Sequence, residues 1–462
     1  MQNYAEFLDQ SVNFPQEEFK SDESRLFFHN IDLMDVIEKH GTPLRFTYLP
    51  IISKKIQQAK LYFQTALLKN DYQGKYYYCY CTKSSHFKHV MDEALKNNIH
   101  LETSSAYDMP IIESLEKTGQ LTKDMFIVCN GYKRELYKDK IIEALKKGYH
   151  NLIPVLDNME EFNYYKEHNT TPCDLGIRIA SEEQPGFDFY TSRLGIRAED
   201  AVEFYLREIK PHKQYRLKLF HFFINDGISD SPYYWSELEK HIQLFCKLKK
   251  VNPHLSMLDI GGGFPFKNSL SFDYDYEYMA QEIVARIKAI CAENNVEEPD
   301  IVTEFGKYTV AESQGTLFSV LGKKQQNDRE KWFMLDGSFI TTLPDVWAIN
   351  QRYILLPINN WDAPYTNVNL GGITCDGQDY YNQEAHVNTL FLPDSEKQQY
   401  IGFFHTGAYQ EVLSGAGGIH HCLIPTPKHI LIQKDKNGKL EHKVFAEEQD
   451  PDEVLKILGY KL

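Results

Sequence analysis

The chain has 462 residues and carries 50 Lys and Arg against 65 Asp and Glu, a formal net charge of −15. Such a charge repels phosphate backbones and anionic membranes, so nucleic acids and membrane surfaces are poor partners. Hydrophobic residues make up 42% and charged residues 25%, which excludes collagen-like, disulfide-scaffold and wholly disordered classes. We expect a globular protein of about two to four domains.

The cysteines and the N-terminus bear on the cellular compartment. The eight cysteines form no CxxC pair and no zinc-ribbon spacing. The first residues contain early acids and no uninterrupted apolar core, and no apolar run reaches the ~18 residues of a membrane span. The sequence therefore predicts a cytoplasmic protein with neither a secretion signal nor a membrane anchor.

Taken in chain order, the first 45 residues contain a strand candidate in RLFFHNIDLMDVIEKHGTPLRFTY. From residue 46 to about 310, short β-branched or aromatic runs alternate with longer segments of helical periodicity, the pattern of parallel βα units. Eight runs favour closure into a (β/α)8 TIM barrel over residues 46–310. The runs are KYYYCYC (75–81), IHLETS (99–104), MFIVCN (125–130), NLIPVLD (151–157), DLGIRIA (174–180), LKLFHFFI (217–224), SMLDIGG (256–262) and IVTEF (301–305).

After residue 310 the pattern changes, because loops rather than long helices separate the apolar runs. We expect a C-terminal β-rich domain, a barrel or a sandwich, formed by residues 311–462 together with residues 1–45. The runs are WFMLDGSFI, RYILLPIN, VNLGGIT, QYIGFFH and HILIQK.

Polar residues, and at one position a run of three glycines, mark the ends of the predicted barrel strands, where the loops share one face and reactive groups gather. They are Lys83, Glu102, Asn130, Asp157, Arg178, His221, Gly261 to Gly263 and Glu304.

At three of these strand ends, the residues have both a chemical and a structural interpretation. Lys83 follows an aromatic strand, where partial desolvation would favour a neutral amine that condenses with a carbonyl, or it is a solvated lysine. Gly261, Gly262 and Gly263 allow close approach to an anion, or they form a tight turn. Glu304 could keep a ring nitrogen protonated, or pair with a neighbouring Arg or Lys.

Two further positions also have a chemical and a structural interpretation. His221 could stack on a planar cofactor or be a satisfied core histidine. Thr374, Cys375 and Asp376 place a thiol proton donor beside a carboxylate, or a buried cysteine beside a capping aspartate.

Together and in this order, TKSS, DIGGGFP, EFGKY, TCD and GAY resemble the anchors of the barrel-type (fold type III) pyridoxal-phosphate decarboxylases of basic amino acids. The resemblance runs from Lys83 to Tyr409. It implies a Schiff-base role for Lys83, ring stacking for His221, and pairing of Glu304 with the pyridine nitrogen. The cofactor-binding residues that it implies are Lys83, Arg178, His221, Gly261, Gly262, Gly263, Glu304, Lys307 and Tyr409.

The segment SFITTLPDVWAI (338–349) is most similar to biosynthetic arginine decarboxylases, which implies decarboxylation of L-arginine to agmatine and CO2 for polyamine biosynthesis. Asp345 and Asp376 would then bind the guanidinium, and Cys375 would return a proton to Cα. The alternatives are decarboxylation of ornithine, diaminopimelate or carboxynorspermidine, or a non-catalytic homologue that binds a related enzyme.

The sequence departs from the family in two ways. HFFIND follows the stacking position without the Gly and Ser that commonly hold phosphate there, and 462 residues is short for the arginine subgroup.

The resemblance also implies a homodimer in which the TCD loop completes the site of the opposite subunit. No metal ligand set is predicted: His86 with His89, and His420 with His421, lack a third ligand at suitable spacing, and the sequence selects no oxygen ligands for Mg²⁺.

Overall fold

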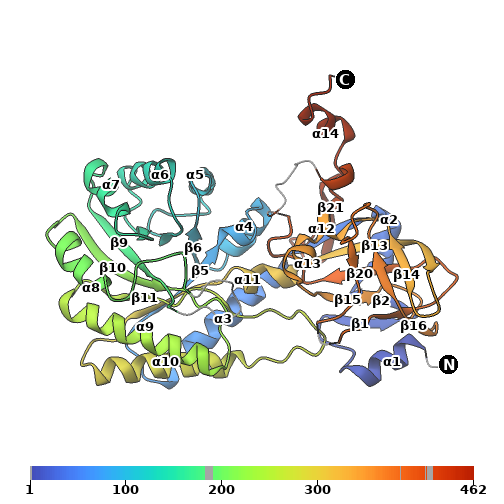
Figure 1. The fold of residues 1–462 in the computed structure, drawn as a ribbon, viewed down its shortest axis with the longest axis horizontal. Coiled ribbons are helices and arrows are strands. Elements are labelled where there is room, and N and C mark those ends of the chain that lie inside the picture. The colour runs from blue at the N-terminus through green and yellow to red at the C-terminus, as the bar shows by residue number, and fades with distance from the viewer. Residues whose placement is uncertain (1–2, 183–190, 386, 412, 414–419, 462) are drawn as a thin grey trace. The chain divides into compact units, whose positions relative to one another are not determined.

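The structure is a computed structural model that describes residues 3–182, 191–385, 387–411, 413 and 420–461. It divides into two units (Figure 1). The barrel unit consists of Ile52–Pro265 and Tyr274–Thr309. The β-rich unit consists of Met1–Ile51, Phe266–Asp273 and Val310–Leu462. Among the helices of the described residues, none combines the length and the apolar character that crossing a bilayer requires.

Eight parallel strands close into a barrel in the order β10-β11-β12-β5-β6-β7-β8-β9, which confirms the predicted TIM-barrel class. Each strand overlaps one of the eight predicted runs. The bounds are β5 (Tyr76–Cys81), β6 (His100–Thr103), β7 (Ile127–Cys129), β8 (Leu152–Leu156), β9 (Cys173–Ile179), β10 (Tyr215–Phe222), β11 (Met257–Asp259) and β12 (Asp300–Glu304).

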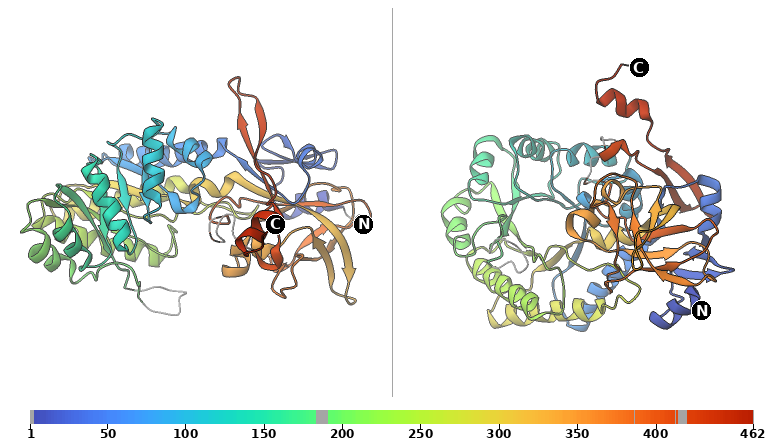
Figure 2. Two further views of the ribbon diagram at one scale, coloured as in Figure 1. Left: turned by 90° about the horizontal axis from the view of Figure 1, so that it is seen from above. Right: turned by 45° about the vertical axis from the view of Figure 1, so that its right-hand side comes forward.

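Helices follow the strands and surround the barrel, as the right-hand view of Figure 2 shows. The capping residues explain where they begin: at α9, the Ser231 hydroxyl accepts a hydrogen bond from the backbone N–H of Tyr234, and Pro232 opens the first turn. The helices are α3 (Pro50–Lys69), α4 (Lys88–Leu95), α5 (Asp108–Lys117), α6 (Glu135–Lys146), α7 (Glu161–His168), α8 (Ala201–Phe204, continued by a π-turn), α9 (Pro232–Val251), α10 (Tyr276–Glu293) and α11 (Lys307–Val310).

The β-rich unit is built on the long strand β13 (Gln314–Gln325), which is not among the strands predicted from the sequence. It pairs with β14 (Lys331–Leu335), β20 (Tyr400–Phe404) and β4 (Leu44–Tyr48). The N-terminal strand β4 also pairs with β21 (Lys428–Lys434), so both ends of the chain contribute to one sheet. The other strands are β1 (Phe19–Asp22), β2 (Arg25–Phe28), β3 (Ile31–Asp32), β15 (Ile354–Pro357), β16 (Tyr365–Asn367), β17 (Asn369–Gly371), β18 (Tyr380–Tyr381), β19 (Phe391–Pro393) and β22 (Leu440–Ala446).

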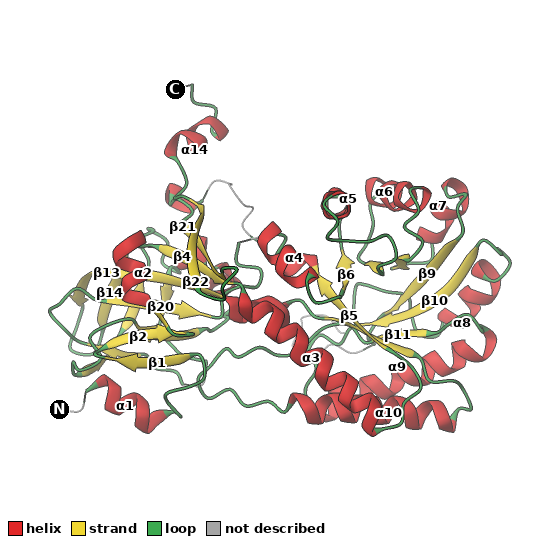
Figure 3. Cartoon of the chain, turned by 180° about the vertical axis from the view of Figure 1, so that it is seen from behind, coloured by secondary structure: helices red, strands yellow, loops and turns green. Residues whose placement is uncertain are grey.

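One predicted strand is partly a helix. The run WFMLDGSFI begins as β14, but its end forms α12 (Phe339–Thr342), because the Ser338 hydroxyl accepts from the backbone N–H of Thr341 and caps a turn. The remaining helices of this unit are α1 (Tyr4–Ser11), α2 (Leu33–His40), α13 (Pro344–Ile349) and α14 (Pro451–Ile457). Figure 3 shows that strands dominate this unit, whereas helices and strands alternate in the barrel unit.

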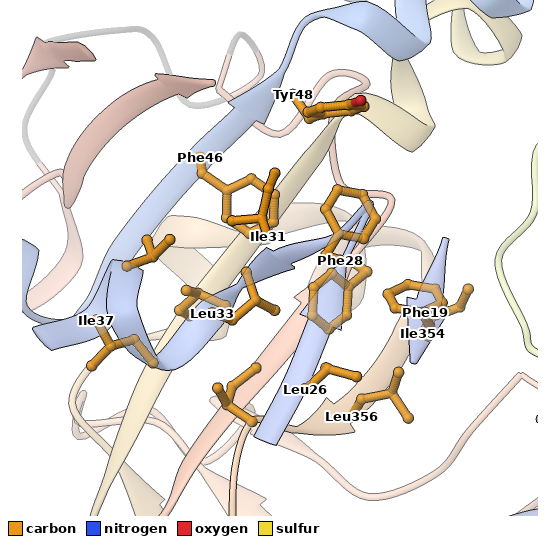
Figure 4. Close-up of a cluster of buried hydrophobic side chains, with 14 of the residues drawn as sticks. Phe19, Leu26, Phe28, Ile31, Leu33, Ile37, Phe46, Tyr48, Ile354 and Leu356 are labelled. Carbon is orange, nitrogen blue, oxygen red and sulfur yellow. The ribbon is translucent and has the colours of Figure 1, made fainter. Parts of the chain in front are cut away.

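The core of the β-rich unit brings the N-terminal segment together with the C-terminal strands (Figure 4). Phe28 and Phe46 are fully buried beside Leu356. α2 joins this core because Asp32 caps its start, accepting from the backbone N–H of Met34, and its apolar face is buried.

A buried ion pair stabilises the same unit. Arg45 Nη1 lies 2.8 Å from Glu411 Oε1, and His429 Nδ1 lies 3.3 Å from that oxygen. Gln314 donates to the other carboxylate oxygen at 2.8 Å. The neighbouring Arg45 and His429 hold the pKa of Glu411 well below its ordinary value against the effect of burial. The stabilisation is therefore present above the ordinary carboxyl pKa and is lost as the pH falls towards the lowered one.

Replacing Glu411 with Gln should lower the free energy of unfolding by about 3 kcal/mol at neutral pH, because Arg45 would stay buried without a counter-charge. Chemical denaturation of the variant measures this effect. Glu441→Gln on the exposed strand β22 is the matched control and should change the midpoint little. A loss below ~0.5 kcal/mol for Glu411→Gln, the size of an ordinary surface substitution, would contradict the expectation.

Candidate active site

Polar side chains gather at the C-terminal ends of the barrel strands, the end at which barrel enzymes carry their reactive groups. Lys83 follows β5, Asn130 follows β7 and Asp157 follows β8. The others lie on strands: Glu102 on β6, Arg178 on β9, His221 on β10, Asp259 on β11 and Glu304 on β12.

Lys83 lies in the 3₁₀ turn Thr82–Ser84 directly after β5. Its Nζ donates to Oε2 of the fully buried Glu102 at 2.7 Å. Removal from water alone would lower the pKa of Lys83, but Glu102, with help from Glu304, raises the pKa well above its ordinary value. The expectation of a neutral amine is therefore wrong for this arrangement, since the partner carboxylate keeps the ammonium charged.

Glu304 ends β12 with its side chain almost fully buried. Asn130 donates to its Oε1 at 2.6 Å. Burial, and then the nearby Asp259 carboxyl, raise the pKa of Glu304 well above its ordinary value. A cation placed beside this acid would act in the opposite sense and favour the carboxylate.

His221 and Asp259 lie side by side on adjacent strands, buried against Glu304. His221 Nδ1 is 3.3 Å from Asp259 Oδ2 and 4.0 Å from Glu304 Oε1. Within the described part of the chain, neither Nδ1 of His221 nor Oδ2 of Asp259 makes a hydrogen bond of good geometry. Burial lowers the pKa of His221 to about 4 and raises the pKa of Asp259 to about 7. The imidazole is therefore neutral at physiological pH.

Arg178 brings positive charge to the same end of the barrel. Its Nε is buried and finds no hydrogen-bond acceptor among the described residues. Burial lowers the pKa of Arg178, whereas Asp157 and Glu304 act in the opposite sense. A buried donor of this kind is available to an acceptor on a ligand.

The glycine run after β11 has no room for side chains. Gly261 and Gly263 have φ of +71° and +113°, a region that favours glycine. A Cβ on Gly262 would lie 2.4 Å from the carbonyl oxygen of Glu304. The run is a tight turn whose backbone lies close to its neighbours, and a glycine-rich turn of this kind can serve as an anion cradle.

Gly227 occupies the loop after β10 that lacks the family's Gly and Ser. A Cβ on Gly227 would lie 2.8 Å from the Gly263 carbonyl oxygen, and the Ile228 N–H donates to that oxygen at 2.9 Å. The small residue needed beside the glycine run is thus supplied farther along the loop. Gly227 was not predictable from the sequence, because no motif spacing marks it.

These features fit pyridoxal phosphate. The carboxyls of Asp259 and Glu304 could pair with a cationic ring nitrogen, the unpaired Arg178 Nε–H could donate to an oxygen of the ligand, and the glycine run offers backbone to a phosphate. Lys307, half-buried at the start of α11, belongs to the same unit.

The other predicted site residues lie in the β-rich unit. Asp345 is buried on α13, where Gln410 donates to its Oδ2 at 2.9 Å and accepts from its backbone N–H at 3.1 Å. Tyr409 is partly buried with φ of 70°. Cys375 and Asp376 are exposed in the loop between β17 and β18.

Asp379, which sequence reasoning missed, fixes that loop. Its buried carboxylate accepts from the hydroxyl of Thr374 and from the backbone N–H of Phe339, both at 2.7 Å. The TCD loop is therefore tied to the segment that carries Asp345.

Comparison with known proteins places this site in a family. Residues 54–311 match the model of the pyridoxal-dependent decarboxylases, pyridoxal binding domain. A biosynthetic arginine decarboxylase of Prochlorococcus marinus subsp. pastoris is 22% identical, over 93% of this chain and 85% of its own. That alignment spans 564 positions, more than the 462 residues of this chain, so the relative carries inserted segments.

Solved structures share the fold. That of the biosynthetic arginine decarboxylase of Campylobacter jejuni is 19% identical with a TM-score of 0.80, covering 100% of this chain and 91% of its own. That of a diaminopimelate decarboxylase from M. jannaschii is 16% identical with a TM-score of 0.78, covering 95% of this chain and 97% of its own. With more than half of its length matched by the family model, the chain belongs to the pyridoxal-dependent decarboxylases.

Proposed function

We propose that this protein decarboxylates L-arginine to agmatine and CO2. The observation that carries the chemistry is the cluster of the partly exposed Lys83 with the buried Glu102, His221 and Glu304 at one end of the barrel. The similarity of nearly the whole chain to biosynthetic arginine decarboxylases supports the choice of arginine.

When bound, pyridoxal phosphate supplies an aldehyde that joins amines and a ring that accepts the electrons left on Cα as CO2 departs. Lys83 would hold the coenzyme covalently, and Glu102 would take up and return the proton of its amine. Glu304 would pair with the ring nitrogen and His221 would lie against the ring face. Arg178, Lys307, Tyr409 and the backbone of Gly261, Gly262 and Gly263 would bind the coenzyme's remaining polar groups.

The β-rich unit would bind the substrate's guanidinium and supply the proton that completes the reaction. Asp345, held in place by Gln410, and Asp376 would bind the guanidinium through charge-assisted hydrogen bonds. Cys375 would donate a proton to Cα, so that arginine and one proton give agmatine and CO2. We place Cys375 and Asp376 in the site of a partner subunit, in a homodimer in the cytoplasm that serves polyamine biosynthesis.

Product identification tests the proposal. Purified protein with pyridoxal phosphate should form agmatine from arginine. A different main product would identify a different substrate. Putrescine would indicate ornithine, lysine would indicate diaminopimelate, and norspermidine would indicate carboxynorspermidine. No CO2 from any of these would favour the non-catalytic homologue.

Asp345→Asn should lower kcat/KM for arginine by about 10- to 100-fold, because a hydrogen bond to a charged group contributes about 1.5–3 kcal/mol. The loss should appear mainly in KM, measured by agmatine release. Asp362→Asn, at an exposed position of the same unit, is the control. An unchanged kcat/KM in Asp345→Asn would remove that residue from substrate binding.

A further inference from the structure

Two exposed cysteines and a histidine from distant parts of the sequence meet on the β-rich unit. Cys375 Sγ and Cys422 Sγ are 3.5 Å apart. One ligand atom each from Cys375, His421 and Cys422 lies within 4.8 Å of the others. The sequence left His421 without a third ligand, and the fold supplies two thiols.

The backbone on both sides holds this cluster. On one side, Asp379 fixes the loop of Cys375 through Thr374. On the other, Cys422 has a left-handed φ of 54° in the turn His421–Leu423, which aims two successive side chains at one point. His420, next in the chain, points elsewhere and bonds to Thr426 at 2.9 Å.

We propose that Cys375, His421 and Cys422 form a binding site for a thiophilic divalent cation of the zinc class. Two thiolates and an imidazole are the ligands that zinc takes in proteins. Thiolates bonded at about 2.3 Å to one tetrahedral zinc lie roughly 3.8 Å apart, close to the 3.5 Å that separates these sulfurs. Three protein donors leave a fourth position open to water or to a small ligand.

The site has a consequence for the enzyme that rests on the proposed function. A thiol coordinated to zinc has given up its proton. If Cys375 returns the proton to Cα, zinc at this site removes the proton donor. Zinc should then inhibit decarboxylation reversibly, and a chelator should restore it.

Cobalt substitution tests the site without reference to activity. The tag-free holoenzyme should bind one equivalent of Co²⁺ with intense d–d absorption in the red, where a pyridoxal chromophore does not absorb, and Zn²⁺ should displace it. Because loss of an outer partner of a metal ligand already costs 10- to 100-fold in affinity, Cys422→Ser should weaken Zn²⁺ binding by about 100-fold or more in calorimetry. His421→Ala should weaken it similarly, and Cys422→Ala, which cannot ligate at all, should repeat the result.

His420→Ala is the matched control and should keep the cobalt spectrum. Absence of the spectrum in the unaltered protein, or its survival in Cys422→Ser, would overturn the site. Equal loss in His420→Ala and His421→Ala would overturn the assignment of His421, and a Cys375–Cys422 disulfide in place of bound metal would overturn the proposal.

Activity measurements distinguish a failure of the proposed metal site from a failure of the proposed function. Cys422→Ser should keep the basal rate while needing at least about 10-fold more Zn²⁺ for half-inhibition. Stoichiometric binding of zinc without inhibition would support the metal site and refute Cys375 as the proton donor.

Discussion

Replacing Lys83 with alanine should reduce kcat for decarboxylation by about 10⁴-fold or more, the scale on which loss of a covalently acting group operates. The amine is the group that would hold the coenzyme, and no described neighbour on the turn Thr82–Ser84 can replace it. Agmatine release measures the rate. Borohydride reduction followed by peptide mapping should find the pyridoxyl group on Lys83 in the unaltered protein and on no lysine in the variant.

Lys88→Ala is the matched control, because Lys88 is exposed nearby and pairs with the partly exposed Asp92. Mixing the inactive Lys83→Ala and Cys375→Ala proteins should restore part of the activity if each site takes residues from two subunits. Full turnover by a strictly monomeric preparation, or no recovery on mixing, would contradict the proposed shared site.

Glu304→Gln should lower kcat by about 100- to 1,000-fold, the usual cost of removing one preorganised electrostatic partner. The amide has nearly the same shape but cannot carry the negative charge that a cationic ring nitrogen requires. Attachment of the coenzyme to Lys83 should persist, which separates an electronic role from a folding defect. Glu160→Gln, at an exposed position of the barrel unit, should keep full activity.

The same variant should change the pH dependence of stability. Because the pKa of Glu304 is raised in the folded protein, the folded state binds more protons than the unfolded state above the ordinary carboxyl pKa. The free energy of unfolding of the unaltered protein therefore falls as the pH rises above the ordinary carboxyl pKa. As the pH rises above the ordinary carboxyl pKa, cofactor-free Glu304→Gln should lose less stability than the unaltered cofactor-free protein. An identical pH profile in thermal unfolding would rule out the raised pKa.

The barrel was predictable because its information is local. Each parallel strand is a short apolar run buried on both faces, and turn residues separate it from an amphipathic helix. The β-rich unit was less predictable. Its long strand β13 begins in an apolar stretch but ends in exposed polar residues, so its sequence has neither strict alternation nor a clear end. Its pairing with β4 depends on residues far apart in the chain.

The candidate site also has features that the sequence predicts and features that it does not. Strand-end position placed Lys83, His221 and Glu304 at one end of the barrel, where the structure also has them. The pairing of Lys83 with Glu102, and the charge state that follows, depend on side-chain distances across adjacent strands. Gly227 acts through one close backbone contact, and Asp379 through hydrogen bonds to distant loops, neither of which leaves a pattern in the sequence.

The contact between the glycine run and the strand β12 fixes the distance between that run and Glu304. The Glu304 N–H donates to the Gly261 carbonyl at 2.9 Å, and Gly262 lies too close to the Glu304 carbonyl for any side chain. The anion cradle and the acid are consequently joined through backbone and cannot drift apart independently. If the glycine run binds the coenzyme phosphate as proposed, this contact fixes the distance between the phosphate and the acid that would pair with the ring nitrogen.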